Sequence, residues 1–327
     1  VQAAAAESVT TYKAYSNAGI LSSAKVFYIP VFKNMPNDTT SNTDNDSNNT
    51  NSTTVSGLTL TKRTTTSLSY KWNSVSGATK YYIHITNVSR GTTFDKTVTS
   101  NSATLNGLTE GNNYAVKVRA YTSSGWQPYS DTKTKHTLPA QVTGLKRTAR
   151  TATTISLSWN KVYGAGGYYI YKYVNGKYTL LKDVSGGSTT SVKVTGFSAG
   201  AQYRLCVAAY VSDGTKSRGA RSSRVLGVTR PYKVANLTLS CPSSTQIKSS
   251  WKKNSAGVTG YQICYSRDSK FKNVVALKSI TSASTVSYVG KNFTTGITYY
   301  IKVRAYVTVG KTNYYGEWSD VSSIKCK

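Results

Sequence analysis

One phrase occurs three times in this chain: Leu108-Thr-Glu-Gly111-Asn-Asn-Tyr114, Phe197-Ser-Ala-Gly200-Ala-Gln-Tyr203 and Phe293-Thr-Thr-Gly296-Ile-Thr-Tyr299. Each copy places a large apolar residue, a glycine and a tyrosine at offsets of 0, 3 and 6. Alternate residues after each tyrosine are apolar, and they share one face because strand side chains alternate with period two. Each phrase therefore introduces a half-buried β-strand, whose apolar face is formed by Val116, Val118 and Ala120, by Leu205, Val207 and Ala209, or by Ile301, Val303 and Ala305.

One tryptophan precedes each of these tyrosines, by 42, 44 and 48 residues. The three, Trp72, Trp159 and Trp251, are separated by 87 and 92 residues. The sequence therefore predicts a tandem array of three domains, each large enough to bury a modest core.

These features resemble the fibronectin type III domain. The resemblance rests on the tryptophan, on a tyrosine that opens a later strand and on the tyrosine of the repeated phrase, and it covers residues 56–327. It implies an all-β chain of three immunoglobulin-like β-sandwiches, in which the repeated-phrase tyrosine bonds to the backbone just upstream. It implies no activity, because this fold hosts many unrelated roles. The structural residues it predicts are Trp72, Trp159, Trp251, Tyr81, Tyr168, Tyr261, Tyr114, Tyr203 and Tyr299.

The expected sandwiches span residues 56–138, 139–230 and 231–327. Their junctions are short, and each contains a proline, Pro139 or Pro231, that fixes φ. We therefore expect a semi-rigid rod, with its flexible joint before the first sandwich.

Residues 1–36 resemble the closing segment of the glucosaminidase domain of secreted Gram-positive cell-wall hydrolases. The pattern predicts a helix through Leu21 and a short strand from Val26 to Phe32. In that family the catalytic glutamate lies upstream, on a part that this chain does not contain, and Glu7 lies outside the matching residues. Chance similarity of a strand and a turn is the alternative. The residues that carry the resemblance are Ala14-Tyr15, Ala18-Gly19-Ile20-Leu21 and the run from Phe27 to Pro36.

Residues 37–55 are expected to form a flexible linker. From Asn37 to Thr54 the chain has only polar residues, mainly Asn, Asp, Ser and Thr, and such a stretch cannot bury enough surface to offset its ordering entropy. The opening Val1-Gln2-Ala3-Ala4-Ala5-Ala6 is similar to the small-residue end of a signal peptide. Together with the hydrolase resemblance, this indicates a secreted protein.

Positive charge is concentrated in the repeats. The net charge of the chain is +29, residues 1–55 contribute −1, and the repeats therefore carry +30 with eight acidic residues. Such a surface attracts polyanions over about a Debye length, roughly 8 Å. The alternative is a compositional bias that serves solubility, since solvent-facing strand positions also hold Lys and Arg in any sandwich.

Arginine and tryptophan vary together among the repeats. Repeats one and three have Arg119 and Arg304 on the outward face, together with Trp126 and Trp318 near the last strand, whereas repeat two has Ala208. This covariation predicts stacking of guanidinium on indole, worth about 0.5–1 kcal/mol, which would brace the sheet edge. A carbohydrate platform on the free indole face is the alternative.

Tyr314 and Tyr315 are further binding candidates. They are placed in the loop before the last strand, where sandwich loops often carry binding. Ordinary strand propensity of tyrosine is the alternative explanation.

Four cysteines are too few for a disulfide scaffold. Cys241 and Cys326 fall near one pole of the third sandwich and are a candidate disulfide. Cys206 and Cys264 are out of phase with the core and are expected to be outward or half-buried thiols. None has metal-ligand spacing.

Catalytic chemistry is not expected in this chain. Only two histidines are present, the carboxylates of the repeats have no paired spacing, and no glycine-rich phosphate loop precedes a helix. We therefore expect no catalytic residue, metal or cofactor. No apolar run of membrane-spanning length occurs, and nucleic acid is a weak candidate because charge alone is not specific.

The sequence favours a secreted, cell-wall-associated binding and spacer rod, whose basic sandwiches bind wall polyanions or glycans. Two alternatives remain. The chain is the non-catalytic portion of a cell-wall glucosaminidase, or it is an adhesive or structural surface protein that binds another protein.

Overall fold

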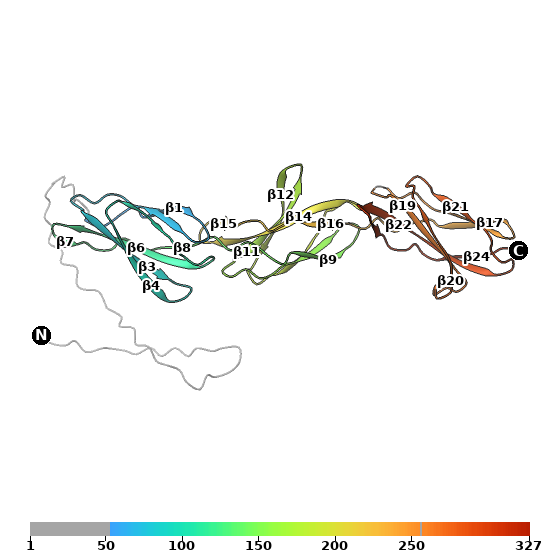
Figure 1. The fold of residues 1–327 in the computed structure, drawn as a ribbon, viewed down its shortest axis with the longest axis horizontal. Coiled ribbons are helices and arrows are strands. Elements are labelled where there is room, and N and C mark those ends of the chain that lie inside the picture. Colours follow the sequence, from blue (N-terminus) through green and yellow to red (C-terminus); the bar gives the residue numbers. More distant parts are fainter. Residues whose placement is uncertain (1–52, 256) are drawn as a thin grey trace, which may run out of the picture. The chain divides into compact units, whose positions relative to one another are not determined.

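A computed structural model of the protein describes residues 53–255 and 257–327, and the regular elements assigned there are β-strands. Six sheets pair into three β-sandwiches with the same strand order (Figure 1). The expected all-β class with three sandwiches is confirmed. The expected glucosaminidase-like segment, residues 1–36, and the linker up to residue 52 lie outside the described residues. Val55, the last residue assigned to that linker, is 2% exposed and belongs to the core of the first sandwich.

The first sandwich contains a three-stranded sheet in the order β1-β2-β5 and a larger sheet in the order β4-β3-β6-β7, in which β8 also pairs with β6. Its strands are β1 (Thr59–Arg63), β2 (Leu68–Lys71), β3 (Lys80–Asn87), β4 (Thr92–Val98), β5 (Ser102–Leu105), β6 (Asn113–Thr122), β7 (Gly125–Trp126) and β8 (Lys133–His136).

The second and third sandwiches repeat this arrangement. The small sheet of the second consists of β9 (Lys146–Arg150), β10 (Ile155–Ser158) and β13 (Ser191–Val194), and the large sheet of β11 (Gly167–Val174), β12 (Lys177–Ser185), β14 (Gln202–Ser212), β15 (Lys216–Arg218) and β16 (Val225–Val228). The small sheet of the third consists of β17 (Thr238–Ser243), β18 (Gln246–Ser250) and β21 (Ser287–Gly290), and the large sheet of β19 (Gly260–Ser266), β20 (Val274–Ile280), β22 (Thr298–Val309), β23 (Thr312–Tyr315) and β24 (Ser322–Lys325).

The predicted tryptophan and tyrosine residues lie at the centres of the three cores. Trp72, Trp159 and Trp251 are each at most 5% exposed. Each indole packs against the tyrosine that follows it in the large sheet, with ring centroids 5.1–5.4 Å apart, in the pairs Trp72–Tyr81, Trp159–Tyr168 and Trp251–Tyr261. Aromatic pairs at this separation stabilise a core beyond the area they bury. The same contact therefore holds the two sheets together in all three sandwiches.

The tyrosine of the repeated phrase closes a local corner. The hydroxyl oxygen of Tyr114 accepts a hydrogen bond from the backbone N–H of Thr109 at 2.8 Å. Equivalent bonds run from Ser198 to Tyr203 at 2.9 Å and from Thr294 to Tyr299 at 3.0 Å. Each tyrosine therefore fixes the turn that precedes its own strand.

The glycine of the repeated phrase has a left-handed backbone, with φ of 66° at Gly111, 61° at Gly200 and 78° at Gly296. Glycine adopts this conformation without the steric cost that a Cβ would bring. Gly111 and Gly200 have a second constraint, because an added Cβ would overlap the backbone of Tyr163 or Gly257 in the following sandwich. At Gly296 nothing lies within 4 Å of that position. The repeated glycine is thus a turn residue in three places and a junction residue in two.

Asp213, between β14 and β15 of the second sandwich, reaches into the first. Its carboxylate lies 3.0 and 3.2 Å from the two terminal nitrogens of Arg63 and accepts the backbone N–H of His136 at 2.8 Å. Its backbone carbonyl accepts a hydrogen bond from Lys135 at 2.7 Å. Burial alone would raise the pKa of Asp213, but the bonds from Arg63 and His136 outweigh it and hold that pKa below its usual range.

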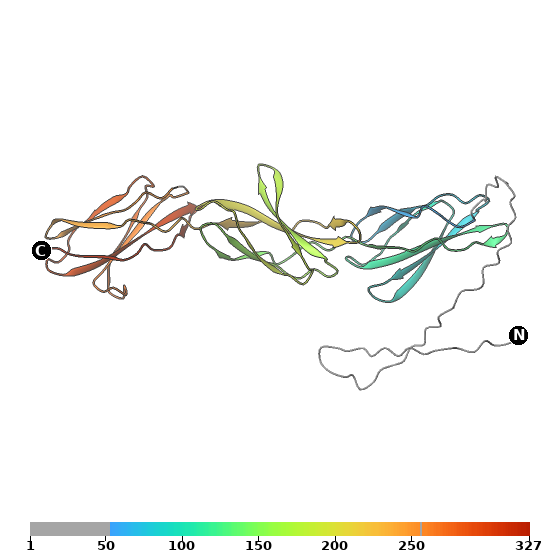
Figure 2. The same ribbon diagram turned by 180° about the vertical axis from the view of Figure 1, so that it is seen from behind.

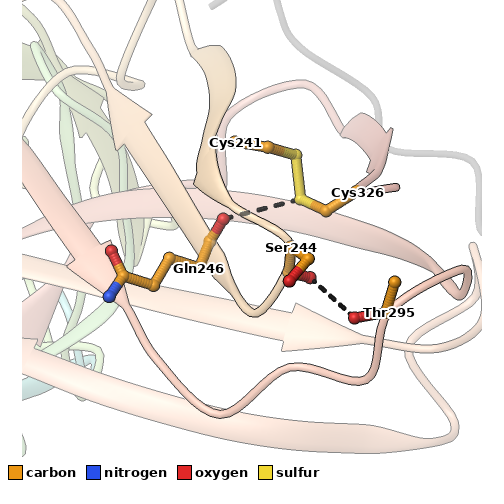
Figure 3. The surroundings of a disulfide bond; sticks show 5 residues. All are labelled: Cys241, Ser244, Gln246, Thr295 and Cys326. Atoms are coloured by element: carbon orange, nitrogen blue, oxygen red, sulfur yellow. Dashed lines mark hydrogen bonds between the residues drawn. A yellow bond between two sulfur atoms is a disulfide. The ribbon is translucent and has the colours of Figure 1, made fainter.

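Cys241 and Cys326 form a disulfide across 85 residues, the pairing expected from the sequence. Figure 3 shows it beside the β17–β18 turn, where Thr295 donates a hydrogen bond to the carbonyl of Ser244 at 3.2 Å. The bridge therefore ties the end of the last strand to the first strand of the third sandwich. The part of the chain that the structure describes contains no helix long and apolar enough to cross a bilayer.

Candidate binding surface

The outer face of the large sheet of the third sandwich carries a stack of alternating cations and rings. Arg304 lies over the rings of Tyr315 and Trp318, at 3.8 and 4.3 Å from their centroids. Lys302, two residues earlier on β22, lies over Phe271 at 3.7 Å and over Trp318 at 5.0 Å. The order Phe271, Lys302, Trp318, Arg304, Tyr315 therefore alternates ring and cation throughout.

The first sandwich builds the same kind of stack. Arg119 lies 4.8 Å from the ring centroids of both Trp126 and Tyr129. Lys117 covers Tyr129 at 4.4 Å, and Lys80 lies 5.5 Å from Trp126. The predicted stacking of guanidinium on indole is therefore present in both sandwiches that contain the two residue types.

The two tryptophans do not occupy equivalent positions, which corrects the sequence alignment. A buried serine fixes the register, because Ser130, Ser222 and Ser319 each accept the backbone N–H of the equivalent valine of the long strand. Trp318 directly precedes Ser319, whereas Trp126 lies four residues before Ser130. Trp126 is instead equivalent to Tyr315, and Trp318 to Tyr129. The alignment of the repeats from sequence was wrong because it matched Trp126 to Trp318 rather than Ser130 to Ser319.

In the second sandwich, the cation and the rings of the stack come from other elements. The position of Arg119 and Arg304 holds Ala208, but Arg221, in the segment between β15 and β16, lies 4.7 Å from the ring centroid of Tyr171 and 4.1 Å from that of Tyr178. The cation here comes from the segment between β15 and β16 and the rings come from β11 and β12, so the outward face is covered without an Arg–Trp pair. Burial in this stack raises the pKa of Tyr171.

Cys206 and Cys264 are buried, at 0 and 4% exposure, and the expectation of outward or half-buried thiols was wrong. The phase was correct, since Cys206 pairs with Tyr171 and Cys264 with Lys302 on the outward face. The stacked rings and cations cover that face and exclude water from the thiols. Burial raises the pKa of both thiols.

Tyr314 and Tyr315 lie in strand β23, not in the loop where they were expected. The ring of Tyr315 is covered by Arg304, and the ring of Tyr314 lies 4.6 Å from the guanidinium of Arg150 in the second sandwich. Both are half-buried. Their contacts within the protein occupy ring surface that a sugar would need.

The same limit applies to the carbohydrate platform proposed for tryptophan. Trp318 is contacted by Lys302 and Arg304, and Trp126 by Lys80 and Arg119. A sugar ring binds an indole by lying on its face, so these cations compete for the same surface. The stacks therefore favour a structural role for Trp126, Trp318, Arg119 and Arg304.

An open groove in the second sandwich is the surface that the sequence analysis missed. It has a volume of ≈ 630 Å³ and is lined by Gln141, Tyr178, Arg204, Ser222, Ser223, Arg224, Val225 and Leu226. Arg204 and Arg224 are exposed, and no carboxylate is among the lining residues. Figures 1 and 2 show the β11–β12 hairpin, which carries Tyr178, standing out from the body of this sandwich. A groove with two guanidinium groups, two serines and an aromatic edge suits an anionic ligand.

The charge around the groove is not cancelled within the second sandwich. Residues 139–230 contain fourteen Lys and Arg residues and two acidic residues, Asp183 and Asp213. Asp183 pairs with Lys216 and accepts the hydroxyl of Tyr210, and Asp213 pairs with the first sandwich. The run Ser222-Ser223-Arg224 was the sequence signal that could have indicated part of the groove. Among the described residues, no group of three His, Cys, Asp or Glu side chains is placed to hold a metal ion.

A known domain model matches more than half of the chain. The model of the fibronectin type III domain matches residues 53–135 and 140–225. The chain belongs to the fibronectin type III family. The third sandwich of this fibronectin type III chain, outside those ranges, has the same strand order as the first two.

Chitinase A1 of Niallia circulans is 28% identical to the chain over 222 residues, which cover 62% of the chain and 28% of the chitinase. The chain thus matches little more than a quarter of that relative. Among solved structures, the FN1–FN3 domains of chicken CNTN1 align with 84% of the chain and 98% of their own length, at 18% identity and a TM-score of 0.30. A two-domain fibronectin type III segment of chicken tenascin aligns with 53% of the chain and 97% of its own length, at 20% identity and a TM-score of 0.33.

Proposed function

We propose that the chain is a non-catalytic, extracellular binding and spacer segment, and that it attaches to polyanions of the bacterial cell wall through the second sandwich. The groove between Tyr178, Arg204 and Arg224 carries the proposal, because it is open and basic and has no carboxylate in its lining. Arginine suits phosphate groups because its planar fork donates two parallel hydrogen bonds. The disulfide of the third sandwich supports an extracellular location, since such bonds persist in oxidising compartments.

The surrounding charge supports the proposal. The net charge of +29 draws a polyanion toward the chain, and the groove gives it a place with paired donors. Arg224 lies over the ring of Tyr173, 4.1 Å from its centroid, but its side chain is exposed, and stacking leaves the N–H groups in the plane of its guanidinium able to donate to an anion. Binding should therefore depend on the second sandwich more than on the total charge.

The test is co-sedimentation of the chain with purified Gram-positive walls, before and after their teichoic acids are removed, over a range of salt concentrations. The double variant Arg204→Gln and Arg224→Gln is compared with a double variant of equal charge, Lys193→Gln and Lys146→Gln, on the small sheet of the same sandwich. Binding should fall with salt because bound counterions are released. The groove variant should lose most of its binding and its salt dependence, whereas the control should resemble the parent. Equal losses in both would show that charge alone is responsible.

A second candidate function is an accessory part of a secreted glycoside hydrolase. The match to a stretch of chitinase A1 is the observation that favours it. The sequence encoded upstream of Val1 in the source genome tests this candidate. An open reading frame that continues into a catalytic domain would support it, and a start codon with a signal peptide directly before Val1 would exclude it.

A further inference from the structure

The edge strand of the large sheet in the third sandwich differs from those of the other two. β20 pairs with β19 and, among the described residues, with no other strand. Six of its seven residues are exposed. Val274, Val275 and Leu277 are 46, 40 and 56% exposed. An unpaired, apolar edge offers a row of backbone donors and acceptors to any extended segment that can reach it.

In the other two sandwiches, a lysine of the equivalent edge strand bonds to the neighbouring sheet. On β4, the ammonium group of Lys96 donates a hydrogen bond to the carbonyl of Thr104 on β5 at 2.8 Å. On β12, Lys182 reaches the carbonyl of Lys193 on β13 at 3.5 Å. These bonds cross from the edge strand of one sheet to the other sheet. They therefore fix the edge strand against the sandwich and leave it less free to accept a partner.

Lys278 occupies the equivalent position on β20. It faces Ile263, as Lys96 faces Ile83 and Lys182 faces Ile170. Within residues 257–327 no bond joins Lys278 to β21, and Val289, which takes the place of Thr104, is 36% exposed. Within residues 257–327, no bond of Lys278 therefore ties β20 to β21, and the ammonium group of Lys278 is available to a carboxylate.

We propose that β20 is a docking strand, to which an extended acidic segment of a partner protein adds as a further antiparallel or parallel strand. The backbone of β20 from Ala276 to Ile280, where its register with β19 is regular, supplies the ladder, and Leu277, which faces Cys264, supplies apolar contact on the outward face. The acidic character follows from Lys270 and Lys272 in the preceding loop and from Lys278 within the strand.

The neighbouring charges and the chain as a whole support this choice of partner. The carboxylate of Asp268, in the same loop, is occupied by the backbone N–H groups of Lys270, Lys272 and Asn273. A second copy of this chain is disfavoured at this edge, because two molecules of net charge +29 repel one another.

The probe is a fluorescein-labelled peptide in which glutamate and valine alternate over the length of β20. Binding to the full chain is followed by fluorescence anisotropy, and amide hydrogen exchange locates it. The variant is Leu277→Asp, which places a like charge in the ladder. The matched control is Leu180→Asp on β12, since Leu180 is 49% exposed and faces Tyr171 as Leu277 faces Cys264. A second control is the same peptide with proline in place of each valine, which keeps the charge but cannot pair.

The proposal expects the alternating peptide to bind and to slow amide exchange in residues 274–280. It expects Leu277→Asp to weaken binding by about tenfold or more and Leu180→Asp to leave it within about twofold. Equal weakening by both variants, or equal binding of the proline peptide, would show attraction by charge alone and would overturn the proposal. Absence of binding up to about 1 mM peptide would also overturn it, and dimerisation of the chain that Leu277→Asp abolishes would assign the edge to a second copy instead.

Discussion

Asp213 of the second sandwich holds Arg63 of the first with both carboxylate oxygens, although the two residues are 150 positions apart in the chain. Their side chains are 7 and 12% exposed. Breaking a hydrogen-bonded ion pair that is shielded from water costs more than breaking an exposed pair, because removal of one partner leaves the other charge buried. The contact therefore stabilises the junction between the two sandwiches.

Replacement of Asp213 tests this contact. Asp213→Ala should weaken the junction by about 2 kcal/mol, a typical value for hydrogen bonds to a charged group. Because the carboxylate accepts the N–H of His136, exchange of that amide should accelerate by about 30-fold. Asp320→Ala is the control, since its side chain is 95% exposed and pairs with Lys233. Unchanged exchange at His136 in the Asp213 variant would contradict the assigned role.

The same contact should respond to acid. The pKa of Asp213 is lower in the folded protein than in the unfolded chain, so its contribution is complete above the unfolded value of about 3.9 and is lost as pH falls through the lower, folded value. Protection of the His136 amide should therefore decrease below about pH 4 in the parent. In Asp213→Asn this step should be absent, although the whole chain still loses stability as its other carboxylates protonate.

Gly200 and Gly296 should differ in how well the fold tolerates their replacement by alanine. Both Gly200→Ala and Gly296→Ala place a Cβ on a left-handed backbone, which costs about 1 kcal/mol. Only Gly200→Ala also drives that Cβ into the backbone of Gly257 across the junction. Differential scanning calorimetry should show the larger loss for Gly200→Ala. Equal losses would mean that the glycine serves the turn alone.

Removal of the stacked arginine should destabilise the third sandwich. Arg304→Leu loses the contacts with Tyr315 and Trp318 and two hydrogen bonds to Gln262, at 2.9 and 2.6 Å. We expect a loss of about 2 kcal/mol, from stacking and from the buried amide of Gln262 left without its partner. Arg304→Lys should recover part of this loss, and Lys311→Leu, on the exposed β22–β23 turn, should have little effect. Thermal unfolding followed by tryptophan fluorescence measures the difference.

The four cysteines should separate into two chemical classes. Reduction of the Cys241–Cys326 bridge opens a loop of 85 residues and should destabilise the third sandwich by about 4 kcal/mol. Cys206 and Cys264 are buried and have raised pKa values, so iodoacetamide should modify them only after unfolding. Mass spectrometry of alkylated protein checks both points, and rapid modification of either thiol in the folded protein would contradict the burial described above.

Much of the architecture could be predicted because it depends on local periodicity. The Trp72–Tyr81 core pair and the Tyr114 corner recur with similar spacing in each repeat, so one pattern predicted three sandwiches. The side-chain register of the segment before each last strand, β8, β16 or β24, could not be predicted in this way. It depends on Ser130, Ser222 and Ser319, whose role is visible only when the backbone donor across the sheet is known.

The groove was missed for a related reason. Arg204 and Arg224 are 20 residues apart and become neighbours only when β14 pairs with β16. The burial of Cys206 was missed because alternation predicts which face a side chain takes and not what covers that face. In this protein long cationic side chains cover the face that carries Cys206, whereas composition alone predicts that such side chains point into solvent.

The stacks also change what the high isoelectric point means. Among the described residues, nine Lys and Arg side chains lie over aromatic rings, and one of them, Arg221, lies over Tyr171, which pairs with the buried Cys206. Neutral replacements there would expose ring and thiol surface, so selection cannot discard these charges as freely as those on an ordinary solvated face. Part of the protein's basicity is therefore required by its architecture, and it would persist whether or not the chain bound an anionic ligand.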